Sequence, residues 1–199
     1  MVDAIKAVYV IIGLPVSILI QGLFHLYLMR KGGIIMNYNF EKFVNQKTEV
    51  FADTCFLMND YFLGRFYPAL EQYNRTSSGR KLLINILPSC FMELEKLTFD
   101  KDNNVAVKAA KCLEIIRKDL RLHHNFKKYT EGSYTQFGDA SLLSAVISLR
   151  LSNAVNVLTQ DNKLTSDLYQ INQYESCYGY NIEVCRFDSY GQVSEAAHS

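Results

Sequence analysis

Short apolar segments alternate with longer segments of helical periodicity along most of this chain. Strand-like runs fall at residues 49–54, 81–87, 154–159 and 182–187. Helix-like stretches fall at residues 55–67, 89–97, 103–122, 139–151 and 160–172. Strands that alternate with helices pair in parallel through right-handed crossovers. The pattern therefore predicts an α/β fold, a three-layer α/β/α sandwich around a central parallel sheet, with 182–187 as the last strand.

Composition sets limits on the class of protein. A chain of 199 residues with 49% hydrophobic content suits one domain of ordinary size. The net charge of +1 gives no global attraction to a polyanion, so contact with nucleic acid requires a local basic patch and bound metal. The cysteines are odd in number and form no metal-binding pair, which indicates reduced thiols in a cytosolic setting. They are Cys55, Cys90, Cys112, Cys177 and Cys185.

A hydrophobic segment occupies the amino-terminal part of the chain. Residues 7–29 carry no formal charge and are long enough, as a helix, to cross a hydrocarbon core of roughly 30 Å. Basic residues follow this segment, which by the positive-inside rule keeps the larger part of the chain in the cytoplasm. An amphipathic or core helix is the alternative. Translation could also begin at Met36, and the protein would then be cytoplasmic.

The sequence therefore predicts four segments. Residues 1–35 form a hydrophobic helix that acts as a membrane anchor, 36–48 a connector, 49–190 the folded domain and 191–199 a tail. The expected location is the cytoplasmic face of a membrane, with a single span and the carboxyl-terminal domain inside. Within the domain, Ser89 and Asp102 are each expected to cap the helix that follows them.

Acidic residues stand where strand-like runs give way to helices or turns. They are Asp53, Glu93, Asp139 and Asp161. The carboxyl ends of parallel strands line a common crevice, so these side chains can converge. Two carboxylates 4 Å apart repel by roughly 4 kcal/mol at an effective dielectric near 20. Four in one pocket therefore require a divalent cation or raised pKa values, and oxygen ligands suit Mg²⁺ or Mn²⁺.

Four motifs around these acids, in this order, resemble the PIN domain, a nuclease family. They are ADTCFL around Asp53, PSCFMELEKL around Glu93, GDASLLSAV around Asp139 and LTQDNKL around Asp161. The resemblance spans roughly residues 50–187. It implies a ribonuclease-like fold with an acidic pocket that binds magnesium or manganese and cuts phosphodiester bonds, usually of RNA. It also assigns supporting roles to Thr54, Thr159, Asn162 and Asp167.

The leading hypothesis is an endoribonuclease in which Asp53, Asp139 and Asp161 hold the principal metal. Glu93 then serves a second metal or a metal-bound water. One alternative is a catalytically silent PIN-like scaffold that binds RNA or protein. Another is a single-pass membrane protein that recruits partners, with the acids as helix caps or turn residues. Taken singly, Asp139 fits a cap and Glu93 a solvated acid in the first turn of its helix.

Basic residues offer candidate RNA contacts. One group of basic residues is interleaved with the aromatic residues Phe126 and Tyr129. This group can hold an RNA backbone and stack a base, although a solvated helix face explains the basic residues equally. They are Arg117, Lys118, Arg121, Lys127 and Lys128. A weaker basic group comprises Arg75, Arg80 and Lys81. His123 and His124 are candidate metal ligands or bases, but adjacent histidines in a polar stretch are usually only exposed.

The apolar residues after the first strand could form a homodimer face or a partner groove, or could equally be core. They are Phe56, Leu57, Phe62 and Phe66. Toxins of toxin-antitoxin pairs form one branch of the PIN family, so the resemblance also allows an inhibitory protein partner. No residue of this chain selects that branch.

Overall fold

The computed structural model describes residues 38–44, 48–130, 138–174 and 179–196. The hydrophobic segment at residues 7–29, and with it the predicted membrane anchor, lies outside these residues. Within the described part of the chain, no helix combines the length and the apolar character that crossing a bilayer requires.

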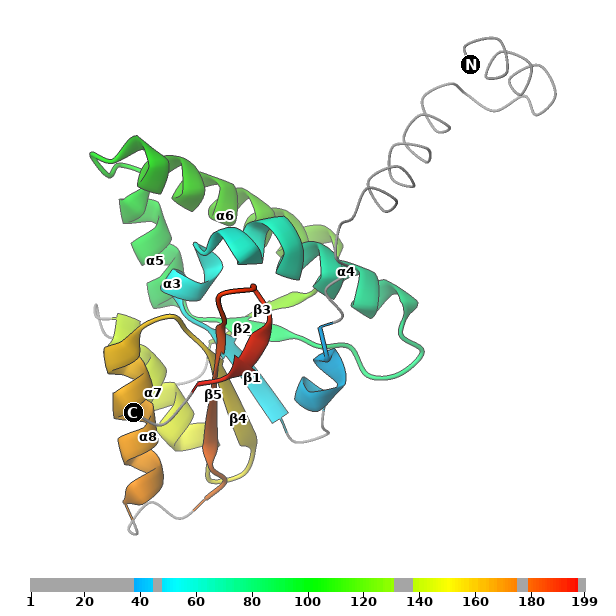
Figure 1. Cartoon of the computed structure of the whole chain (residues 1–199), viewed down its shortest axis with the longest axis vertical. Helices are drawn as coiled ribbons and strands as arrows, with labels where there is room; N and C mark the ends of the chain where they lie inside the picture. Colours follow the sequence, from blue (N-terminus) through cyan, green and yellow to red (C-terminus); the bar gives the residue numbers. More distant parts are fainter. Residues whose placement is uncertain (1–37, 45–47, 131–137, 175–178, 197–199) are drawn as a thin grey trace, which may run out of the picture. The chain divides into compact units, whose positions relative to one another are not determined.

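A mostly parallel sheet of six strands forms the centre of the fold (Figure 1). The strands are β1 (Thr48–Ala52), β2 (Ile84–Ile86), β3 (Phe126–Lys128), β4 (Ala154–Leu158), β5 (Ile182–Phe187) and β6 (Val193–Glu195). Their order across the sheet is β3-β2-β1-β4-β5-β6, and only β6 pairs antiparallel with its neighbour. The predicted α/β class with a parallel central sheet is therefore confirmed.

The strand order reverses between β1 and β4. From β1 the chain builds outward through β2 and β3, and it then crosses back to β4 and builds in the other direction. In open α/β sheets such a reversal leaves a crevice outside the carboxyl ends of the strands, where ligands bind. Asp53 follows β1 directly, and its backbone N–H donates to Leu158 O of β4 at 3.0 Å. The first predicted acid therefore lies at this crevice.

The helices form two groups around the sheet. The first contains α3 (Thr54–Leu57), the π-helical turn η2 (Phe62–Phe66), α4 (Tyr67–Thr76), α5 (Pro88–Leu97) and α6 (Asn103–Leu122). The second contains α7 (Gly138–Leu149) and α8 (Asn162–Gln173), which lie side by side in Figure 1. Helix α6 packs beside β3, and α8 packs beside β5. This arrangement is consistent with a three-layer sandwich.

Aromatic packing fixes the corner where β1 turns into α3. Phe56, Leu57, Phe62 and Phe66 are each 0% exposed. The Phe56 ring stacks on Phe187 of β5 with centroids 4.3 Å apart, and Phe66 meets Phe56 edge-on at 5.5 Å. Each such ring removes about 150–250 Å² from water. The suggestion that these residues form a dimer face or partner groove is therefore wrong, because they are core.

The fold extends beyond the predicted domain limits. The short helix η1 (Phe40–Phe43), predicted as connector, buries both phenylalanines. Strand β6 lies in the predicted tail, so the prediction that 182–187 is the last strand is wrong. The β5–β6 turn depends on Asp188, whose Oδ1 accepts from the N–H of Tyr190, and on Gly191 at φ +79°. A Cβ on Gly191 would lie 2.5 Å from the Tyr61 ring, so this position requires glycine.

Two predicted helix starts have different outcomes. Asp102 caps α6 as predicted, because its Oδ1 accepts from Asn104 N–H at 2.8 Å. Ser89 does not cap α5. That helix begins one residue earlier at Pro88, a residue favoured at the first helical position, and Leu87 is its N-cap. The sequence predicted Glu93 in the first turn of this helix. That prediction is wrong, because Glu93 lies beyond the first turn.

Candidate functional site

Asp53 joins the carboxyl ends of β1 and β4. Its side chain is 8% exposed and caps α3, with Oδ1 accepting from Thr54 N–H at 2.7 Å. Its Oδ2 accepts from the Thr159 hydroxyl, directly after β4, at 3.1 Å and from the Cys55 thiol at 2.7 Å. Both carboxylate oxygens are therefore held in fixed positions at the switch in strand order.

Thr54 connects this corner to the second acid. Its hydroxyl donates to Glu93 Oε2 at 2.7 Å, which links α3 to α5. The same Glu93 oxygen lies 3.5 Å from where a Cβ on Gly138 would stand, so Glu93 is next to the start of α7. Asp139 is the following residue. The expected supporting role of Thr54 thus has a geometric basis, because Thr54 contacts two of the predicted acids.

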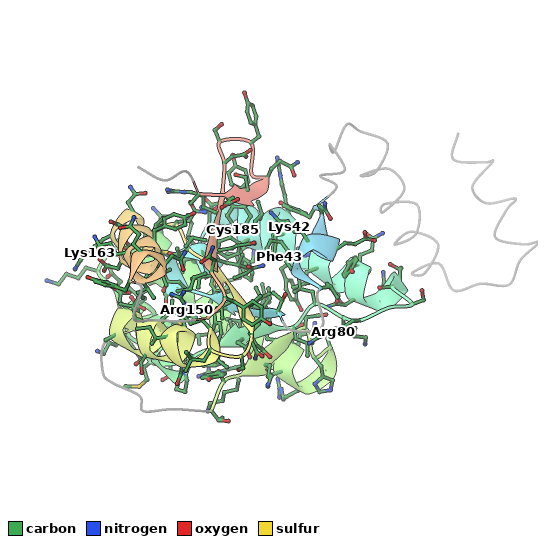
Figure 2. The ribbon with its side chains drawn as sticks, turned by 90° about the horizontal axis from the view of Figure 1, so that it is seen from below. Lys42, Phe43, Arg80, Arg150, Lys163 and Cys185 are labelled. Carbon is green, nitrogen blue, oxygen red and sulfur yellow. The ribbon has the colours of Figure 1, made fainter. Side chains whose placement is uncertain are left out.

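The electrostatics of Asp139 place three further carboxylates near it. Asp139 is exposed in the first turn of α7. Partial burial raises its pKa above the ordinary 3.8, and the charges of Asp53 and Asp161 raise it further. Asp167 adds to this effect, whereas the Lys163 ammonium opposes it. The Lys163 side chain extends outward from α8 (Figure 2). Negative charge therefore exceeds positive charge around Asp139.

Asp161 is the N-cap of α8, and its side chain bonds to the first turn of that helix. Its Oδ1 accepts from the N–H groups of Lys163 at 2.6 Å and Leu164 at 3.0 Å. Thr159 supports this turn, since its hydroxyl oxygen accepts from Asp161 N–H at 3.0 Å. Asn162 instead accepts from Arg186 at 2.7 Å through Oδ1. Thr159 thus contacts two of the acids, while the Asn162 side chain is engaged elsewhere.

The acids gather at the carboxyl ends of the strands, but they do not form a complete set of metal ligands. Among the residues that the structure describes, no three His, Cys, Asp or Glu side chains are arranged to hold a metal ion. Hydrogen bonds already engage three of the carboxylate oxygens, both of Asp53 and one of Asp161. The donor set is nevertheless carboxylate and hydroxyl oxygen, which suits Mg²⁺ or Mn²⁺. The excess negative charge at Asp139 also fits a divalent cation.

A pocket of about 380 Å³ opens beside Glu93 and Asp139. One face of α5 and the start of α7 form its wall. The other lining residues are Ser89, Met92, Lys96, Leu97 and Gly138. The sequence did not single out Met92 or Lys96. Their spacing on α5, three and seven positions after Ser89, is the signal that could have placed them on one helical face.

The predicted RNA-binding residues are exposed but do not form one surface at the acids. Arg117 pairs with Glu95, and Arg121 Nε donates to Arg117 O, while Lys118 is exposed on α6. Lys127 lines a cavity of about 130 Å³ that includes residues at the amino ends of β1 and β2. Lys128 ends β3 at the same edge as the acids, with Nζ 5.9 Å from the Phe91 centroid.

The two aromatic residues expected to stack a base are buried. Phe126 is 3% exposed and Tyr129 is 6% exposed. Phe126 stacks on Tyr67 with centroids 5.8 Å apart, and Tyr129 packs edge-on against Phe51 at 5.1 Å. The expectation that they stack a nucleobase is therefore wrong, because they belong to the core.

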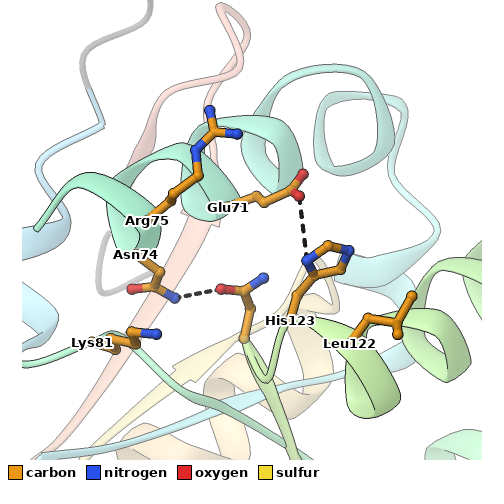
Figure 3. Close-up of a pocket in the computed structure, with 7 residues that line it drawn as sticks. Glu71, Asn74, Arg75, Lys81, Leu122 and His123 are labelled. Atoms are coloured by element: carbon orange, nitrogen blue, oxygen red, sulfur yellow. Dashed lines mark hydrogen bonds and ion pairs between the residues drawn. The ribbon is translucent and has the colours of Figure 1, made fainter.

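His123 lies beside Glu71 in a pocket near the amino ends of β2 and β3 (Figure 3). It lies three residues before the start of β3, and its Nδ1 is 3.6 Å from Glu71 Oε1. Arg75 and Lys81 line the same pocket of about 190 Å³. The strands β1 and β3 run parallel. His123 and this weaker basic group therefore lie near the amino ends of the strands, away from the acids at the carboxyl ends. His124 is exposed with φ +58°.

Cys55 is a further residue in contact with Asp53. Burial and the Asp53 charge raise the pKa of the Cys55 thiol from 9.0 to about 12, which reduces its thiolate fraction about 10³-fold. At pH 8 we therefore expect iodoacetamide to label Cys55 far more slowly in the native chain than in urea. Mass spectrometry of the peptide that contains Cys55 measures both rates. Equal rates would contradict the partly buried, protonated thiol.

No protein-family model matches this chain, and no curated protein matches it.

Proposed function

We propose that this chain is a Mg²⁺- or Mn²⁺-dependent endoribonuclease of PIN type, a hydrolase that cuts RNA phosphodiester bonds. The observation that carries the proposal is the gathering of Asp53, Glu93, Asp139 and Asp161 at the switch in strand order. Like charges collect in this way where a cation compensates them. The three-layer PIN-like architecture and the membrane tether at residues 7–29 belong to the same proposal.

The residues divide the work of holding the ion. Asp53, Asp139 and Asp161 hold the principal cation, and Glu93 serves a second. Asp53 is rigid because its oxygens accept hydrogen bonds from Thr54 and Thr159. Glu93 and Asp139 are exposed, so their side chains can turn toward the ion. When bound, the cation neutralises charge on the phosphate and acidifies the attacking water.

Metal binding is tested first by thermal unfolding. We expect Mn²⁺ to raise the melting temperature, because an ion at 100 times its Kd stabilises the folded state by about 2.7 kcal/mol. The Asp53→Asn variant should lose the shift. The matched control is Asp102→Asn, which changes an exposed acid that caps the start of α6. No shift in the parent protein would favour a scaffold.

Cleavage is tested with a mixed RNA pool incubated with the full chain. New RNA ends, mapped by sequencing, are expected with Mg²⁺ or Mn²⁺ and not with a chelator. Identical ends in both conditions would contradict a metal-dependent enzyme.

A catalytically silent PIN-like module that binds RNA or protein is the second candidate. Its support is that Asp53 and Asp161 act as helix caps and that no three described acids are arranged around a metal position. The two candidates differ in the Mn²⁺ shift and in the new RNA ends. A homodimer, an inhibitory protein partner and the cytoplasmic membrane face remain predictions for either candidate.

A further inference from the structure

One face of α5 continues from the acid pocket toward the end of the helix. Ser89, Met92, Lys96 and Phe99 follow one another at spacings of three, four and three residues, which places them on one side of a helix. Phe99 lies just past the helix end, and its N–H donates to Lys96 O at 3.0 Å, so the turn continues. The helical rise separates Ser89 from Lys96 by roughly 10 Å.

The outer residues of this face are free to bind a ligand. Phe99 is 88% exposed and Met92 is 50% exposed. Lys96 is exposed and has no ion pair among the described residues, whereas Arg117 nearby is neutralised by Glu95. An exposed aromatic ring beside an unpaired ammonium is the combination that binds single-stranded nucleic acid, through base stacking and phosphate contact.

Ser89 supplies an independent sign of a missing partner. Its side chain is 5% exposed, and its Oγ has no hydrogen-bond partner among the described residues. Ser89 also lies in the wall of the pocket that holds Glu93 and Asp139. A buried hydroxyl without a partner is unfavourable unless a ligand or water completes it.

We propose that this face, the α5 track (Ser89, Met92, Lys96 and Phe99), binds single-stranded RNA. This deepens the proposed function and rests on it for the direction of the strand toward the acids. Phe99 stacks on a base, Met92 packs against the strand and Lys96 contacts a phosphate. Ser89 pairs with a ribose 2′-hydroxyl, the group that distinguishes RNA from DNA. Duplex RNA does not fit, because its bases are unavailable for stacking on Phe99.

Fluorescence anisotropy with the full chain tests the track without catalysis. The probes are a short fluorescein-labelled single-stranded RNA, DNA of the same sequence and the RNA duplex, all with chelator present. Phe99→Ala is expected to raise the Kd for the single strand about fivefold or more. Lys96→Gln should reduce the slope of log K against log salt by about 0.7, the value for one phosphate contact. Ser89→Ala should narrow the preference for RNA over DNA.

The controls are Lys111→Gln, an exposed lysine on α6, and Leu122→Ala, an apolar residue 64% exposed at the far end of α6. Neither should change the binding of the single strand. Unchanged binding in both Lys96→Gln and Phe99→Ala would overturn the track, as would equal loss in Lys111→Gln. An unchanged ratio of RNA to DNA affinity in Ser89→Ala would overturn the assignment to RNA. Failure of the proposed nuclease function is distinguishable from failure of the track. A chain that binds single-stranded RNA along α5 but does not cut it would contradict only the nuclease function.

Discussion

Asp139→Asn is expected to lower metal-dependent RNA cleavage by at least about 100-fold, because even residues that only support a metal ligand contribute 10–100-fold. The substitution keeps the size of the side chain and removes its charge. Asp139 is exposed and has no hydrogen bond to another described residue, so the fold does not depend on it. Cleavage of a labelled single-stranded RNA with Mn²⁺ measures the loss.

The same substitution should stabilise the metal-free protein in a pH-dependent way. Burial and the charges of Asp53 and Asp161 raise the pKa of Asp139 above 3.8, so the folded state binds its proton more tightly than the unfolded state. Its ionised form therefore opposes folding at neutral pH, and this penalty disappears as the pH falls through the raised pKa. The gain in free energy of unfolding in Asp139→Asn should be largest at neutral pH and absent below 3.8. Urea unfolding with chelator, at several pH values, measures it.

Glu114→Gln is the matched control, since Glu114 is an exposed acid on α6. It should change neither cleavage nor the pH dependence of unfolding. If Asp139→Asn cuts RNA like the parent, Asp139 is not part of the metal site. If it unfolds instead, the carboxylate is structural and the charge argument fails.

The alternation of apolar runs and helical periods was enough to predict β1, β2, β4, β5 and most helices, but not the short strand β3. It succeeded where successive strand residues are buried, as Val155, Val157 and Leu158 are in β4, whereas β3 buries only Phe126. The positions of Asp53 and Asp161 followed from the same pattern, since both stand directly where an apolar run ends. Asp102 was recognisable as a cap because it precedes a long helical period.

The errors arise where a tertiary contact, a proline or a turn decides the outcome. Phe126 lies in a segment rich in basic residues, yet Tyr67 on α4 covers its ring. The start of α5 depends on the fixed φ of Pro88 rather than on the capping preference of Ser89. Strand β6 is short and largely exposed, and its pairing depends on a turn made by Asp188 and Gly191. Apolar periodicity carries no signal for any of these contacts.

Asp119 is the acid that the sequence left unexplained, although its position gives a signal. It follows Cys112 and Ile116 at helical spacing on the inner side of α6, and it is 0% exposed. A carboxylate on an apolar helix face must find hydrogen-bond donors. Its Oδ1 accepts from the N–H groups of Asn125 at 2.8 Å and Phe126 at 2.9 Å. Its Oδ2 accepts from the Asn125 amide at 2.6 Å and the Tyr67 hydroxyl at 3.0 Å.

The Asp119 carboxylate joins α6, β3 and α4 at the amino ends of the strands, whereas the predicted acids lie at the carboxyl ends. Asn125 extends the contact, because its Oδ1 accepts from Asn74 Nδ2 at 2.7 Å (Figure 3). Asp119→Ala would leave two backbone N–H groups, an amide and a hydroxyl without their acceptor. Each unpaired buried group is unfavourable, so we expect the variant to lose roughly 3–5 kcal/mol of stability. Urea unfolding monitored by circular dichroism measures the loss.

Two further variants separate the network from simple packing. Tyr67→Phe removes one of the four hydrogen bonds and keeps the ring against Phe126, so it should lose only about 0.5–1.5 kcal/mol. Asp102→Ala removes an exposed cap and should lose about 1 kcal/mol. A loss in Asp119→Ala no larger than in Asp102→Ala would mean that water replaces the carboxylate. The amino ends of β2 and β3 would then be held by apolar packing rather than by this acid.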